Sequence, residues 1–210
     1  MRRFQDRKQA GLELASKLAS LAGRDDVVVL GLARGGVPVA AAVAHEIGAP
    51  LDVFAVRKLG VPWQQELAFG AVASGGVRVL NEDVVQTLPL PAEVIDEIAE
   101  REEDELRRRE QAYRGDRPPL EVAGKVAVLV DDGIATGSSM RAAVAALRRR
   151  EPSKVVIAVP VAPRETCRAL AKDVDAIICA ATPDPFRAVG VWYDRFDQTS
   201  DEEVRELLGT

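Results

Sequence analysis

The segment from Val126 to Met140, VAVLVDDGIATGSSM, holds the residues whose types and spacing could do chemistry. Two adjacent carboxylates, Asp131 and Asp132, follow five apolar residues, and a turn of small and hydroxylated residues comes next. Ionised carboxylates accept hydrogen bonds from hydroxyl groups, and the N–H groups at a helix N-terminus favour an anion. The segment therefore predicts a site for a ligand that carries a sugar diol and a phosphate.

This chemistry requires a strand before the acids and a helix after the turn. The apolar run 126–130 suits a buried parallel strand, and open α/β sheets bind ligands at the carboxyl ends of their strands. An ordinary strand–turn–helix, with Asp and Ser as turn and capping residues, is the alternative. That alternative explains one Asp and one Ser, but not two acids, two glycines and three hydroxyls together. The turn has no lysine, which excludes a Walker A loop.

The segment resembles the signature of the type I phosphoribosyltransferases, enzymes that use 5-phosphoribosyl-1-pyrophosphate (PRPP). The resemblance implies that Asp131 and Asp132 bind the ribose hydroxyls during catalysis and contact Mg²⁺ indirectly, through those hydroxyls or water. It implies that the following loop binds PRPP through Gly133, Ala135, Thr136, Gly137, Ser138 and Ser139. The 6-oxopurine members of the family carry an aspartate where this chain has Ala135, whereas the adenine-type members carry alanine.

Two other segments are similar to PRPP-binding parts of the family. The apolar run 27–30 precedes a glycine-rich turn, which the resemblance assigns to pyrophosphate and in which a cis peptide is frequent. Its implied ligands are Ala33, Arg34, Gly35 and Gly36. The run 52–58 predicts a strand that ends at Arg57 and Lys58, two cations that lie near pyrophosphate in the adenine-type enzymes. The alternatives are a plain strand-to-helix turn and a solvated basic pair.

The acceptor end of the site is implied more loosely. Residues 68–73 and 77–80 predict a hairpin, and the family has a mobile loop at that place that closes over the site. Glu66 resembles a catalytic glutamate of that loop; its alternative is a surface carboxylate. Residues 183–194 resemble the hood that binds the base in purine-type enzymes. Phe186 is the first candidate to stack on a base and Trp192 the second, although Trp192 also suits packing.

Composition limits the function classes. The chain has 210 residues, 47% of them hydrophobic, which is enough for one domain with a proper core. A net charge of −5 gives no electrostatic support for nucleic-acid binding. The single histidine argues against a zinc site or a Ser-His-Asp triad, and Cys167 and Cys179 are interpreted as unremarkable residues of a reducing compartment. We find neither an 18-residue apolar run nor a signal core, so a cytoplasmic protein without a membrane partner is expected.

Apolar runs alternate with helical patterns along the chain. The runs are 27–31, 52–56, 126–130, 155–159 and 175–180, and the helical patterns between them are 36–47, 138–150 and 164–171. This alternation predicts a Rossmann-like α/β domain with a parallel sheet flanked by helices. The predicted parts are a core at 24–58 and 120–182, a flexible hairpin and charged helix at 59–115, and a small hood at 183–210 with part of the N-terminus. The helix 91–114 is interpreted as solvated, with a homodimer or partner contact as the alternative.

These observations and the resemblance together give one expected activity. The chain is expected to transfer the 5-phosphoribosyl group of PRPP to a nitrogen of a nucleobase-like acceptor, with Mg²⁺ as cofactor, in nucleotide salvage. The alternative is a regulatory protein that senses PRPP on the same fold without turnover. The sequence does not identify the acceptor.

Overall fold

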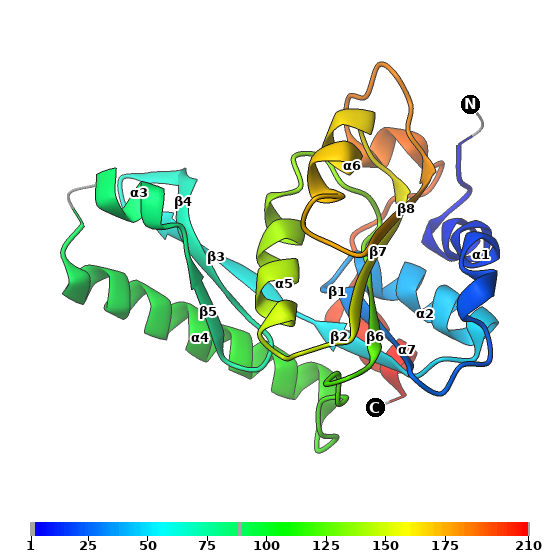
Figure 1. The fold of residues 1–210 in the computed structure, drawn as a ribbon, viewed down its shortest axis with the longest axis horizontal. Helices are drawn as coiled ribbons and strands as arrows, with labels where there is room; N and C mark the ends of the chain where they lie inside the picture. Colours follow the sequence, from blue (N-terminus) through cyan, green and yellow to red (C-terminus); the bar gives the residue numbers. More distant parts are fainter. Residues whose placement is uncertain (1–2, 88–89, 210) are drawn as a thin grey trace.

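The computed structural model describes residues 3–87 and 90–209, except for the side chains of residues 64–67 and 82–83. A five-stranded parallel sheet in the order β2-β1-β6-β7-β8 forms the centre of the molecule (Figure 1). Its strands are β1 (Val27–Leu32), β2 (Leu51–Phe54), β6 (Val126–Val130), β7 (Lys154–Val161) and β8 (Ala176–Ala181). These strands coincide closely with the five apolar runs of the sequence, because a sheet covered on both faces buries most positions of its central strands.

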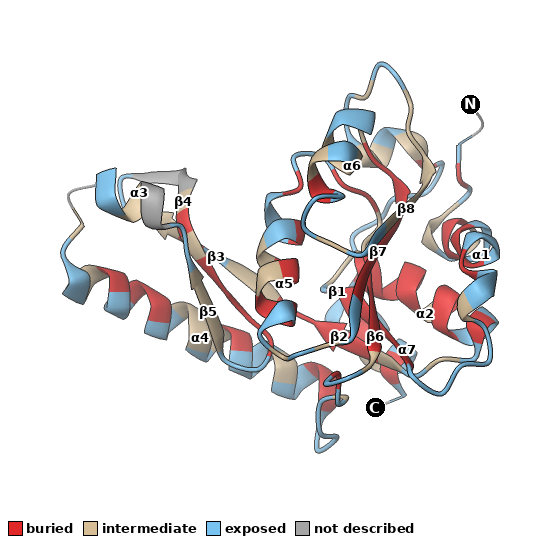
Figure 2. Cartoon of the chain, in the orientation of Figure 1, coloured by how far each residue is buried: buried red, intermediate tan, exposed pale blue. Residues whose placement is uncertain are grey.

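Helices cover both faces of this sheet, which confirms the predicted fold class. Helices α1 (Arg7–Lys17) and α2 (Gly36–Ile47) pack on one face, and α5 (Ser138–Arg148) and α6 (Arg164–Leu170) pack on the other. Buried residues follow the strands and the inward sides of these helices (Figure 2). The short helix η1 (Ala19–Leu21) follows α1, and α7 (Asp201–Leu208) closes the described chain.

A second, antiparallel sheet extends from the core as an arm (Figure 1). It consists of β3 (Val56–Val61), β4 (Gln64–Ala73) and β5 (Val77–Leu80). The prediction of one strand over 52–58 was wrong, because the chain leaves the parallel sheet at Ala55. The Ala55 N–H donates to the Ser74 hydroxyl (2.7 Å) and the Ser74 N–H donates to the Ala55 carbonyl (2.9 Å). Arg57 and Lys58 therefore lie at the start of the arm.

The long charged helix packs along this arm. Helix α4 (Ala92–Arg114) follows the short helix α3 (Glu82–Thr87). The thin apolar stripe of α4, formed by Ile95, Ile98 and Leu106, is buried against β3 and β4. The stripe that suggested a partner contact is thus used within the chain. No helix in the part of the chain that the structure describes is both long enough and apolar enough to cross a membrane.

The last segment of the chain packs against the first. The short helix η2 (Val189–Trp192) ends beside Tyr193, which pairs with Phe4 through an isolated parallel bridge.

The strand order reverses at β1. In the central sheet, β2 lies on one side of β1, whereas β6, β7 and β8 follow on the other side. Ligands of such sheets bind outside the carboxyl ends of the strands where the order reverses. Here those ends belong to β1 and β6.

Candidate active site

The turns that follow β1 and β6 meet at the carboxyl edge of the sheet. Gly31 of β1 is in register with Val130 of β6, so both strands end at the same level. A Cβ atom built on Gly36 would lie 2.5 Å from the Val130 carbonyl oxygen and 2.8 Å from Asp131 Cα. One built on Gly35 would collide with the Asp132 carboxylate. Glycine is therefore required at both positions for the two turns to touch.

Residues 33–36 form the tight turn before α2. The Ala33–Arg34 peptide bond is cis, the feature that the sequence resemblance implied for this loop. The Arg34 guanidinium lies 3.4 Å from Asp201 Oδ1 at the start of α7 and is about one-third exposed. The structure thus places the Arg34 side chain between the turn and α7.

The adjacent carboxylates have different surroundings. Asp131 lines a cavity of about 230 Å³ together with the turn 133–139, and its Oδ1 accepts the Asp132 N–H at 2.8 Å. Asp132 is turned toward the N-terminal helix, where its Oδ2 accepts from Arg7 Nε and Nη2, each at 2.9 Å. Burial raises the pKa of the Asp131 carboxyl well above its usual range, and the charge of Asp132 adds to this. Burial also raises the pKa of Asp132, but Arg7 opposes that shift.

The turn after the acids forms the cavity itself. Its lining includes Gly133, Ala135, Thr136, Gly137, Ser138 and Ser139. Gly137, with φ at +79°, precedes the first residue of α5 and has no side chain with which to cap the helix. The first N–H groups of α5 lack intrahelical partners and carry the positive end of the helix dipole. An anion such as a phosphate fits this position.

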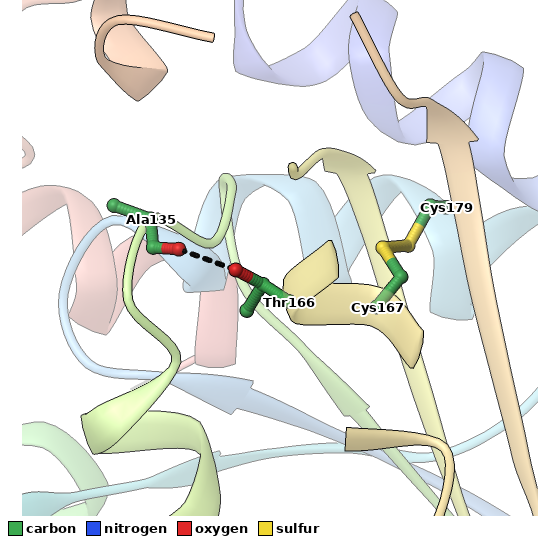
Figure 3. The surroundings of a disulfide bond; sticks show 4 residues. All are labelled: Ala135, Thr166, Cys167 and Cys179. Carbon is green, nitrogen blue, oxygen red and sulfur yellow. Dashed lines mark hydrogen bonds between the residues drawn. A yellow bond between two sulfur atoms is a disulfide. The ribbon is translucent and has the colours of Figure 1, made fainter. Parts of the chain in front are cut away.

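Helix α6 supports the same turn from outside. The Thr166 hydroxyl donates to the Ala135 carbonyl at 3.0 Å (Figure 3), and the next residue, Cys167, forms a disulfide with Cys179 of β8. The interpretation of these cysteines as unremarkable residues was wrong, because they form a disulfide. Their separation of 12 residues carried no pairing signal, because the α6–β8 connection alone brings them together.

The two cations of β3 point to opposite faces of the strand, since side chains alternate along it. Arg57 contacts Glu102 on α4 through Nε (2.6 Å) and Nη2 (2.5 Å). Lys58 lines the cavity beside Asp131 and Ser138. Lys58 also lines a larger cavity of about 600 Å³ between α5 and the arm. The structure therefore brings Lys58, and not Arg57, to Asp131 and the turn 133–139.

The candidate acceptor residues Phe186 and Trp192 pack against the same cluster, which includes Phe4 and Tyr193. Phe186 lines a cavity of about 430 Å³ with Arg164 and Asp184, next to the cis bond between Asp184 and Pro185. Trp192 packs in the cluster of Phe4 and Tyr193, and its buried Nε1 has no hydrogen-bond partner among the described residues. The backbone of Glu66 belongs to β4, but the role given to its side chain lies outside the described residues.

Several residues at the site were missed from the sequence. Arg7 binds Asp132 across 125 positions of the chain, and the Tyr193 hydroxyl donates to the Asp132 carbonyl. The Thr166 hydroxyl donates to the backbone of the turn 133–139. Each of these residues reaches the site only in the folded chain, and no local sequence motif predicted its contact.

Comparisons with known proteins agree with this architecture. A family model described as the phosphoribosyl transferase domain matches residues 60–194. Two Mycobacterium tuberculosis proteins, from strains CDC 1551 / Oshkosh and H37Rv, are provisionally named phosphoribosyl transferases and are each 50% identical over 208 residues. The match covers 99% of this chain and 47% of theirs, so the chain spans about half the length of these curated relatives.

Solved structures give the same result. The crystal structure of TT1426 from Thermus thermophilus is 43% identical, with a TM-score of 0.87 over 99% of this chain and 98% of that one. AQ2163 from Aquifex aeolicus, 14% identical over 88% of this chain and 78% of its own, has a TM-score of 0.50 and shares the fold alone. By the family model and the extent of these matches, the chain belongs to the phosphoribosyl transferase family.

Proposed function

We propose that this chain transfers the 5-phosphoribosyl group of PRPP to a ring nitrogen of a nucleobase-like acceptor and releases pyrophosphate, as in nucleotide salvage. One observation carries the proposal. Paired carboxylates and an uncapped helix N-terminus meet a glycine turn at the strand ends where the sheet order reverses. A sugar phosphate has both of the groups that such a site can bind.

Each part of PRPP has a counterpart in this arrangement. The turn from Thr136 to Ser139 and the first N–H groups of α5 hold the 5-phosphate. Asp131 and Asp132 accept hydrogen bonds from the ribose hydroxyls. The pyrophosphate lies against residues 33–36, with Lys58 as the nearby cation.

The reaction replaces one bond at C1 with another. The C1–O bond to pyrophosphate breaks, the acceptor nitrogen forms a bond to C1, and the proton of that nitrogen leaves to a base. The centre passes through an oxocarbenium-like state. The chain contributes by fixing the ribose, by stabilising the departing pyrophosphate and by excluding water. Glu66 remains the candidate for the proton transfer, and the arm that carries it is the candidate for the closing loop.

The acids could contact Mg²⁺, either directly or through ribose hydroxyls and water. No group of three or more His, Cys, Asp or Glu that could hold a metal occurs among the described residues. Mg²⁺ is usually bound by one or two carboxylates, several waters and the phosphates of a substrate, and Asp131 and Asp132 supply carboxylates of this kind. When bound, Mg²⁺ would neutralise the negative charge of pyrophosphate. We therefore expect PRPP binding to depend on Mg²⁺.

Calorimetry and a product assay test the proposal. PRPP is titrated with and without Mg²⁺, and pyrophosphate release is then measured with a panel of nucleobases. The double variant Asp131→Asn and Asp132→Asn should lose PRPP binding and turnover with its fold intact. The exposed pair Asp25 and Asp26, which precedes β1 at the opposite edge of the sheet, gives a matched control: the same exchange there should change neither.

The outcomes separate the two candidate activities. Mg²⁺-dependent PRPP binding with pyrophosphate release supports transfer and identifies the acceptor. Binding without release on the whole panel would replace transfer with PRPP sensing. If millimolar PRPP produced no heat in the presence of Mg²⁺, both activities would be excluded.

A further inference from the structure

The side chain of Arg7 connects the N-terminal helix to the carboxyl edge of the sheet. It crosses from the first residue of α1 to Asp132, which follows β6, and both of its contacts reach the same oxygen, Oδ2. The two side chains are only 12% and 14% exposed. Among the described residues, no other side chain donates a hydrogen bond to this carboxylate. The pair thus holds Oδ2 from the side of the N-terminal helix.

The hood segment fixes the guanidinium of Arg7 in turn. Arg7 Nη1 donates to the Asp197 carbonyl at 2.6 Å, and the guanidinium carbon lies 4.0 Å from the centre of the Phe196 ring. That ring contacts Tyr193, with centroids 4.9 Å apart, and the Tyr193 hydroxyl donates to the Asp132 carbonyl. These contacts connect Arg7 to Phe196, Phe196 to Tyr193 and Tyr193 to Asp132, the residue that Arg7 binds.

The surroundings of Asp132 explain why its carboxylate needs the guanidinium of Arg7 beside it. Asp132 follows a second carboxylate in the sequence, and both acids are largely removed from water. Without a nearby cation, the two negative charges repel each other, and each carries the free-energy cost of its removal from water. On its other side, the carboxylate touches the backbone of Gly35, where a Cβ could not fit. Oδ2 is therefore enclosed between Arg7 and the turn after β1.

We infer that Arg7 is a positioning residue that orients Asp132 so that Oδ1 receives a ribose hydroxyl of PRPP. This inference rests on the proposed function. Arg7 itself does not touch the substrate. Its planar guanidinium, held at two edges by Asp132 and Asp197 and on one face by Phe196, gives the carboxylate one orientation before the ligand arrives, which lowers the free-energy cost of binding. By the same contacts, the hood and the N-terminal helix become parts of the ribose site.

Variants of Arg7 test this inference through the affinity for PRPP and Mg²⁺, measured by calorimetry without any acceptor. Arg7→Gln should weaken binding about tenfold or more, the scale of one charge-assisted hydrogen bond. Arg7→Lys should recover part of the loss, because an ammonium keeps the charge but lacks the fork of donors. Arg195→Gln is the matched control. It removes an exposed guanidinium that pairs with the neighbouring Asp6 (2.6 Å), and it should leave the affinity unchanged.

A double-mutant cycle distinguishes positioning from general support of the fold. If Arg7 acts through Asp132, then Arg7→Gln in an Asp132→Asn background should cause no further loss. Losses that multiply in the double variant would overturn the inference, as would wild-type affinity in Arg7→Gln. Should Arg7→Gln fail to fold, Phe196→Leu removes the ring beneath the guanidinium and keeps the ion pair, and it must then show a several-fold loss. Wild-type protein that does not bind PRPP would instead refute the proposed function.

Discussion

Gly36 offers the sharpest test of the contact between the two turns. It is the first residue of α2, and its φ lies outside the left-handed region, so the backbone there accepts alanine. The obstacle is space, because the added Cβ would lie 2.5 Å from one backbone atom and 2.8 Å from another. Ordinary contact distances require the turns to separate by roughly 1 Å, and a displacement of that size at an active site can cost about 100-fold.

Gly36→Ala should therefore lose most of its affinity for PRPP and about 1–3 kcal/mol of its free energy of unfolding, the usual range for overpacking. Calorimetry with PRPP and Mg²⁺ measures the first quantity, and urea denaturation measures the second. Gly23→Ala is the control. Its φ is +69° with no atom within 4 Å of the added Cβ, so it should cost about 1–2 kcal/mol of stability and leave the affinity unchanged. Wild-type affinity in Gly36→Ala would refute the reasoning.

Three further predictions concern the remaining contacts. Lys58→Ala should weaken PRPP binding about tenfold or more, whereas Arg57→Ala removes only the pair with Glu102 and should change it less than about twofold; equal losses in calorimetry would contradict the opposite facing of the two cations. Asp52→Ala, which leaves the buried Arg114 guanidinium without its main partner, should lower the free energy of unfolding by about 3–5 kcal/mol in urea. Cys167→Ser should lower it by about 3 kcal/mol under oxidising conditions, from the loop that the disulfide closes, and reductant should reproduce that loss in the wild type alone.

The core of the fold could be predicted well from the sequence, because buried parallel strands have nearly continuous apolar sequences. The run 126–130 became β6 with the predicted bounds, and 36–47 became α2. The arm was predicted less well. Nothing in the run DVFAVRK marks Ala55 as the point of departure from the parallel sheet, since the cause is the buried Ser74, which lies 19 residues later. Local patterns cannot report a break that a distant side chain imposes.

Helix α7 was not predicted, although the sequence carries a signal for its N-terminus. Helix α7 begins after Ser200, whose hydroxyl accepts the Glu203 N–H at 3.1 Å. A serine followed three residues later by glutamate is the usual mark of a helix N-terminus. Arg7 had no comparable signal, because an arginine in an amphipathic helix suits a solvated face. Only the packing of α1 over the sheet, together with the hood, brings its guanidinium to Asp132.

The two acids differ in their ion pairing, and this difference bears on how the site would bind a ligand. Asp132 has a cation of its own, whereas Asp131 has no ion pair in the part of the chain that the structure describes, and burial holds its pKa well above the usual range. A partly buried carboxylate without a cation is costly, and the protein keeps this one at the wall of the cavity that also contains the helix N-terminus. A ligand that supplies hydroxyl donors or a bound cation would stabilise the charged form of Asp131. On the proposed function, PRPP with Mg²⁺ would supply both, so Asp131 would favour the ligand-bound state, and Arg7 would fix the orientation of Asp132 in which that state forms.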